Sequence, residues 1–141
     1  MPDLLRIFLD ANILFSASYK ADHRFLDFWR LLDVVPLVSS YVADEARTNC
    51  IDSSHLARLE SMLVKTHFVT DPLHPHLPAE ITLPSKDQPV LAAAIAAGAH
   101  YLITGDRNHF GRWMRRPIST HVGKLTIIEP ARFLDAHLDR L

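Results

Sequence analysis

Short apolar runs alternate with amphipathic segments along most of the chain. Five runs have the length and the composition of buried strands, at residues 4–9, 37–39, 68–69, 101–104 and 125–128. Between them, apolar positions recur every three or four residues, which predicts helices. The pattern therefore predicts an α/β fold, a three-layer α/β/α sandwich with a central, mostly parallel sheet.

The boundaries of these segments are predicted from proline, glycine and capping residues. Gly98 is placed to end a helix at 88–97, and another helix is predicted at 109–116. Four prolines keep residues 71–84 out of any helix, so this segment is predicted to be a surface loop. Pro36 is predicted to break the chain just before the second strand. The other helices are predicted to begin after Asp10, after a cap at Asp22, at Ser40, at Ser53 or Ser54, and at Pro130.

The length and composition suit a single folded domain spanning residues 1–141. Hydrophobic residues make up 48% of the chain and charged residues 22%, which is ordinary for a soluble protein. The formal net charge is only −1, so any contact with nucleic acid has to come from a local patch rather than from a general basic field. No apolar run approaches membrane-spanning length and no signal-peptide pattern is present, so we expect a cytoplasmic protein without a membrane partner.

Two of the predicted strands end in an acidic residue. Asp10 follows the run at 4–9, and Asp106 follows the run at 101–104 after the strand-ending Gly105. Parallel strands place their carboxyl ends at one edge of the sheet, where α/β proteins carry their chemistry. A carboxylate beside buried apolar residues is costly unless it is paired, hydrogen-bonded or neutralised by a cation.

Two further acids are placed to join this pair. Glu45 lies on the same face of its predicted helix as the apolar Val42 and Ala46, and Asp87 directly precedes the helix at 88–97. Four carboxylates that converge on one point repel one another unless a divalent cation lies among them. Oxygen ligands with water suit Mg²⁺ or Mn²⁺ rather than zinc.

Each acid also has an ordinary explanation that the sequence leaves open. The three aspartates can each cap the helix that follows them. Glu45 can form a surface salt bridge with Arg47 or Arg58.

The arginines after Asp106 also have two interpretations. Arg112, Arg115 and Arg116 have helical spacing on one face, which suits either contacts with RNA phosphates or a solvated surface. The RNA-binding candidates are Arg107, Arg112, Arg115 and Arg116.

The acids lie in segments that resemble a known family. The segment LDANIL, the helix that carries Glu45, the segment KDQPVLAAAIAAGAHYLITGD and the following RNHF resemble a PIN domain, the fold of small metal-dependent ribonucleases that include VapC-like toxins. The resemblance covers nearly the whole chain, and the stretch from 87 to 110 is its most specific part. It implies that the catalytic and metal-binding residues are Asp10, Glu45, Asp87 and Asp106.

The resemblance also assigns supporting residues. Asn12, Thr104 and Asn108 stand where PIN proteins place polar side chains that orient the acids or the attacking water. His109 stands where many relatives carry another acid. The sequence therefore leaves open whether the site holds one metal ion or two.

The activity implied is hydrolysis of RNA phosphodiester bonds, in which Mg²⁺ or Mn²⁺ lowers the pKa of the attacking water and stabilises the leaving oxygen. The chain would be the toxin of a toxin–antitoxin pair. The partners implied are an RNA substrate, a small antitoxin and a second copy in a homodimer.

Three other functions share part of this pattern. A phosphorelay receiver needs a lysine at the end of the last strand, where this chain has Glu129 and Pro130. A phosphatase of the haloacid-dehalogenase type needs a second aspartate at the position of Asn12. A catalytically idle PIN-like module that binds RNA or a protein partner is the remaining alternative, and the complete set of four acids argues against it.

Overall fold

The computed structural model of the chain describes residues 3–141 and contains a six-stranded sheet flanked by helices. The strand order is β3-β2-β1-β4-β6-β5, and every pairing is parallel except that of β5 with β6. The strands are β1 (Leu5–Leu9), β2 (Val34–Ser39), β3 (His67–Val69), β4 (Tyr101–Ile103), β5 (Ile118–Ser119) and β6 (Lys124–Ile128). The predicted α/β class with a mostly parallel sheet is confirmed.

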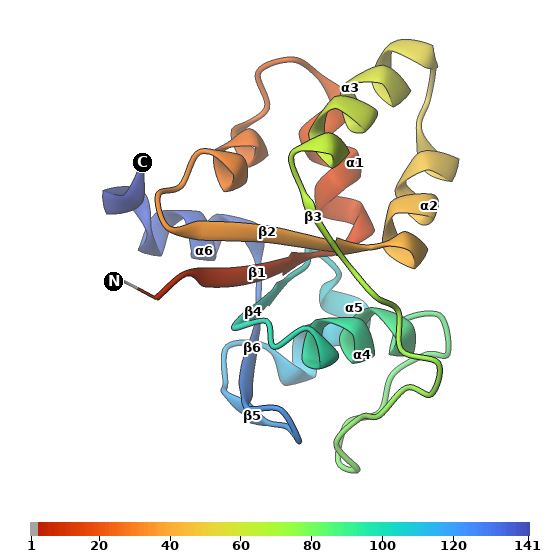
Figure 1. Ribbon diagram of the computed structural model, residues 1–141, viewed down its shortest axis with the longest axis vertical. Coiled ribbons are helices and arrows are strands. Elements are labelled where there is room, and N and C mark those ends of the chain that lie inside the picture. The colour runs from red at the N-terminus through yellow and green to blue at the C-terminus, as the bar shows by residue number, and fades with distance from the viewer. Residues whose placement is uncertain (1–2) are drawn as a thin grey trace.

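Helices connect the strands and pack on the sheet. They are α1 (Ala11–Tyr19), α2 (Ser40–Asn49), α3 (Ser53–Val64), α4 (Gln88–Ala96), α5 (Arg107–Phe110) and α6 (Pro130–Ala136), with 3-10 segments at Arg24–Trp29, Gly111–Trp113 and Leu138–Arg140. In Figure 1, α1, α2 and α3 lie above β1 and β2, whereas α4 and α5 lie below them. None of the helices within residues 3–141 has the length and apolar character needed to cross a membrane.

The core lies between the sheet and these helices. Its largest fully buried side chains include Phe8, Phe28, Phe110 and Phe133. Helix α4 is buried from Val90 to Ile95, which explains its nearly continuous apolar sequence. Gly98 ends this helix with φ of 67°, and its N–H donates to the carbonyl of Ile95 at 2.9 Å. This left-handed cap favours glycine, as predicted, and it turns the chain into β4.

Two predicted boundaries near the N-terminal half are wrong. Pro36 does not break the chain, because β2 runs through it; β3 pairs with β2 only from Leu37 onward, so the proline lies where β2 has an unpaired edge. The helix predicted after a cap at Asp22 is a 3-10 segment, and its cap is the side chain of His23.

The helix predicted at 109–116 is also wrong. Helix α5 already ends at Phe110, and the chain passes through a short 3-10 turn before Met114 pairs with Ile127 beside β6. Arg115 then adopts φ of 69°, a conformation that no helix contains. A buried Met114 and a paired Arg115 stabilise this path through long-range contacts, which local helix propensity does not include.

The strand order directs the functional residues to one edge. From the central β1, the chain continues to β2 on one side, and the later β4 lies on the other side. A crevice therefore opens between the carboxyl ends of β1 and β4, which is where parallel sheets bind ligands.

Candidate active site

A cleft with a volume of about 620 Å³ opens at this edge of the sheet. All four acids predicted from the sequence line it, namely Asp10, Glu45, Asp87 and Asp106. Asn12 also lines it, as do Asn49 and Lys86, to which the sequence did not assign a role. Asn49 is one helical turn from Glu45, a spacing that indicates a shared face.

Asp10 is 5% exposed and follows β1 directly. One carboxylate oxygen caps α1 by accepting from the Ala11 N–H at 2.8 Å, so the capping explanation holds for that atom. The other accepts from the Thr104 hydroxyl at 2.9 Å and the Asn12 amide at 3.2 Å. Burial raises the Asp10 pKa to about 6, against these hydrogen bonds and with the help of the nearby charges of Glu45 and Asp87.

A polar network joins the ends of β1 and β4. The Asn12 amide nitrogen donates to the Thr104 hydroxyl at 3.2 Å, and its amide oxygen accepts from the Gly105 N–H at 2.9 Å. The Asp106 N–H donates to the same hydroxyl at 3.1 Å. These hydrogen bonds fix the position of Asp10 relative to the backbone at Asp106. Asn108, in contrast, is exposed on α5 and does not line the cleft.

Asp87 is the acid whose capping explanation is wrong. It occupies the N-cap position of α4, but its side chain makes no capping hydrogen bond. It is 8% exposed, and its Oδ2 is buried without an aligned hydrogen-bond donor. Burial raises the pKa of Asp87, an effect that neighbouring His109 opposes and neighbouring Asp106 increases. Buried polar atoms without an aligned partner are rare in folded proteins, so this oxygen calls for an explanation.

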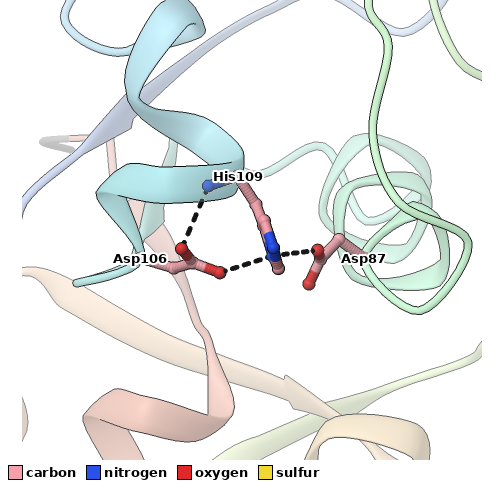
Figure 2. Close-up of side chains that lie close together, drawn as sticks. All are labelled: Asp87, Asp106 and His109. Carbon is pink, nitrogen blue, oxygen red and sulfur yellow. Dashed lines mark hydrogen bonds and ion pairs between the residues drawn. The ribbon is translucent and has the colours of Figure 1, made fainter.

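His109 lies between two of the acids (Figure 2). Its Nδ1 is 2.7 Å from Asp87 Oδ2 and 2.9 Å from Asp106 Oδ2. Asp106 Oδ1 meanwhile caps α5 by accepting from the His109 N–H at 3.1 Å. Despite the short distances, Nδ1 lacks a well-aligned hydrogen bond with either carboxylate. One potential ligand atom from each of the three side chains lies within 4.8 Å of the other two.

Glu45 is an exposed residue of α2 that lines the same cleft. The salt bridges that would explain it are made elsewhere. Arg47 pairs with Asp44 at 2.9 Å and with Glu60 at 2.6 Å, and Arg58 donates to carbonyl oxygens at the end of α1. Neither arginine therefore neutralises Glu45.

The donor set of the cleft fits a divalent cation. The carboxylates of four acids line it, and the Asp87 oxygen without an aligned donor is buried at its wall. Of these acids, Asp87 and Asp106 bring potential ligand atoms within 4.8 Å of one another, together with His109. Asp10, Asp87, Asp106 and Glu45 would hold the ion, and carboxylate oxygens with water are the ligands preferred by Mg²⁺ and Mn²⁺.

The arginines after Asp106 do not share a helix face. Arg115 donates two hydrogen bonds, at 3.1 and 2.9 Å, to Glu129, which is 4% exposed. Burial acts to raise the pKa of Glu129, but the hydrogen bonds from Arg115, a backbone hydrogen bond and the charges of Arg115 and Arg132 together hold that pKa below its usual value. Arg107 lies 3.7 Å from the same carboxylate yet is 75% exposed, and Arg112 and Arg116 are also exposed. Arg115 is therefore tied to a buried acid. Arg112 lies over the Trp113 ring, with its guanidinium carbon 4.9 Å from the ring centroid, and Arg116 donates to the carbonyl of Arg112 at 3.0 Å, so both stay at the surface without an acidic partner within residues 3–141.

Comparison with known proteins identifies the fold family. Residues 6–108 match the profile of a family described as PIN domain. A search of curated protein sequences finds no match.

Three solved structures share the fold. VapBC2 from Rickettsia felis, bound to a DNA fragment from its promoter, aligns with a TM-score of 0.64 and 16% identity over 89% of this chain and 98% of that chain. VapC20 from Mycobacterium tuberculosis, a toxin that cleaves the sarcin–ricin loop, aligns with a TM-score of 0.52 and 16% identity over 71% and 91%. The RRP44 PIN domain of T. brucei aligns with a TM-score of 0.58 and 14% identity over 96% and 82%.

Proposed function

Because the chain belongs to the PIN domain family, we propose that it is a nuclease, and more specifically a metal-dependent endoribonuclease. The observation that carries the proposal is the convergence of Asp10, Glu45, Asp87 and Asp106 on one cleft at the carboxyl edge of the sheet. A structural relative, VapC20, is a toxin that cleaves the sarcin–ricin loop, which supports RNA as the substrate class. The proposed cofactor is Mg²⁺ or Mn²⁺.

The residues of the cleft have different proposed roles in the reaction. A divalent ion held here supplies a water of lowered pKa and neutralises charge on the phosphate. Asp10 is held in place by Asn12 and Thr104, so its free lone pairs keep a fixed direction. Asp87 and Asp106 are our choice for the acids nearest the attacking water. None of the acids acts as a nucleophile; each binds the ion or orients the water.

Cleavage of RNA by the purified chain tests this proposal. We expect cleavage with Mg²⁺ or Mn²⁺ and none in EDTA, and the products should carry 5′-phosphate and 3′-hydroxyl ends. RNA that binds without being cut at any metal concentration would favour the idle binding module instead.

The exposed arginines provide a prediction about RNA binding. Arg112→Ala and Arg116→Ala are each expected to weaken RNA binding and to flatten its dependence on salt, since a variant that neutralises fewer phosphates releases fewer condensed counterions. The slope of log Kd against log salt should fall by about 0.7 for each phosphate of single-stranded RNA that the variant no longer neutralises. Binding titrations at several salt concentrations measure this slope.

Arg115→Ala is the matched control for these variants. It should leave the salt slope unchanged but destabilise the fold by about 1.5–3 kcal/mol, because it removes two charged hydrogen bonds from the buried Glu129. If both Arg112→Ala and Arg116→Ala keep the wild-type salt slope, these arginines do not contact RNA phosphates and belong to the solvated surface.

A second part of the proposal concerns biological role. The Rickettsia felis relative is a VapBC complex, which supports a small antitoxin as a partner and a toxin role for this chain. Overproduction of the chain in bacteria is then expected to slow growth, and Asp10→Asn should relieve the effect. Growth rate at matched protein level is the measurement. Asp44→Asn, an exchange of the same type outside the cleft, should remain toxic; equal growth with all three chains would contradict the toxin role.

A further inference from the structure

We propose that His109 is a nitrogen ligand of the divalent ion, beside Asp87 and Asp106, and that it makes the site select Mn²⁺ over Mg²⁺. The inference rests on the proposed metal-dependent function and names a ligand that the four acids do not include.

Geometry provides the first argument. Ligands at right angles, each about 2.0–2.1 Å from one octahedral ion, stand about 2.9 Å apart. Nδ1 of His109 lies 2.7 Å from Asp87 Oδ2 and 2.9 Å from Asp106 Oδ2, so both separations are close to the spacing of adjacent ligands. Figure 2 shows the imidazole directed between the two carboxylates.

The hydrogen bonding of these atoms provides the second argument. Only 8% of the surface of Asp87 is exposed, and its Oδ2 lacks an aligned donor. The Nδ1 of His109 is likewise buried without an aligned partner. A histidine kept here only as a hydrogen-bond donor would direct its N–H at one of the two oxygens. A shared ion provides one partner for both atoms.

The starts of helices α4 and α5 bring these three residues together. Asp106 ends the loop after β4, and His109 follows one turn later on α5, so their side chains share a face. Asp87 reaches the same point from the start of α4. The imidazole is therefore held from α5, while the carboxylates come from the starts of both helices.

Ligand chemistry then sets the preference for the ion. Mg²⁺ favours oxygen ligands and water, whereas imidazole nitrogen binds transition metals more strongly. Mn²⁺ shares the carboxylate and water ligands of Mg²⁺ but is a transition-metal ion, so an imidazole nitrogen added to the carboxylates should favour Mn²⁺ over Mg²⁺. Replacing the nitrogen with a carboxylate oxygen should therefore reduce the discrimination without abolishing the site.

The test uses calorimetric titration and pulsed electron paramagnetic resonance on the purified chain. In the wild type, Mn²⁺ should bind and show a ¹⁴N hyperfine coupling from a directly bound imidazole. His109→Asp and His109→Gln should both lose this coupling. His109→Asp should also lower the ratio of Mn²⁺ to Mg²⁺ affinity by at least about 10-fold. Mutating a residue that only supports a metal ligand already changes metal affinity by about 10–100-fold, so losing a ligand should change it at least as much.

His121→Asp is the matched control, since it makes the same exchange at an exposed position that does not line the cleft, and its coupling and affinity ratio should equal those of the wild type. If Mn²⁺ binds the wild type without a ¹⁴N coupling, or if His109→Gln keeps the coupling, His109 is not a ligand while the proposed nuclease function stands. If the wild type binds neither ion, the metal-dependent function itself fails, and the two failures are thereby distinguished.

Discussion

Asp10→Asn and Asp106→Asn are each expected to lower metal-dependent RNA cleavage by more than about 100-fold while the fold persists. Each exchange keeps the shape of the side chain but removes a negative charge from the ion. Residues that only support a metal ligand are worth about 10–100-fold, so a ligand should exceed that range. The Asn side chain can still accept the capping hydrogen bonds that Asp10 and Asp106 receive. Single-turnover cleavage with saturating Mn²⁺ is the measurement, with circular dichroism as the check on folding.

Asp44→Asn is the control for this comparison. Asp44 is an exposed residue of α2 that pairs with Arg47 and does not line the cleft, so its exchange should leave cleavage within about 2-fold of the wild type. Full activity in either Asp10→Asn or Asp106→Asn would remove the assignment of these acids to the ion.

The second large effect concerns stability in the presence of metal. A ligand that binds only the folded chain stabilises it by about 2.7 kcal/mol at 100 times its Kd, which corresponds to an increase in Tm of roughly 8 °C for a chain of this size. We expect that increase for the wild type with Mn²⁺. Asp87→Asn should show a much smaller increase, because it removes a buried carboxylate from the proposed metal site.

The order is expected to reverse in EDTA. Without metal, the Asp87 carboxylate is buried near Asp106, and burial together with that charge raises its pKa, so its ionised form is unfavourable in the folded chain. Asp87→Asn removes that charge without removing a cap, since the Asp87 side chain caps nothing. Its Tm in EDTA should therefore equal or exceed that of the wild type.

Asp52→Asn is the matched control for the melting experiment. Asp52 caps α3 by accepting from the His55 N–H at 2.8 Å, and it does not line the cleft. Its Mn²⁺ response should equal that of the wild type. A wild type with no Mn²⁺ response, combined with a clear loss of stability for Asp87→Asn in EDTA, would mean that Asp87 is structural and that the metal site is absent.

Several features of the site follow from local sequence. Asp10 and Asp106 each follow an apolar strand, and the rule that parallel strands share a carboxyl edge predicts that they lie close together. The face that Glu45 shares with Val42 predicts an inward position; the structure has Glu45 exposed, although it lines the cleft. The placement of all these acids at one cleft depends on periodicity and on strand order, which neighbouring residues encode.

Other features depend on contacts between distant residues. Local sequence left Asp87 equally able to cap α4, and only the packing of α4 beside α5 shows its oxygen facing His109 instead. The spacing of Arg112, Arg115 and Arg116 indicated one helix face, but the pairing of Arg115 with Glu129 changes the backbone there. The prediction for Pro36 failed for a similar reason, because whether a strand tolerates proline depends on which of its edges is paired.

The sequence by itself determined the alternation of strands and helices, the membership of nearly the whole chain in an α/β fold, and the four acids that could form a metal site. The tertiary structure alone decided how their carboxylate oxygens are partnered and that an imidazole lies among them. The physical reason is the range of the interactions. Periodicity and capping act within a few residues, whereas burial, ion pairing and ligand geometry arise only where α4, α5 and the ends of β1 and β4 meet.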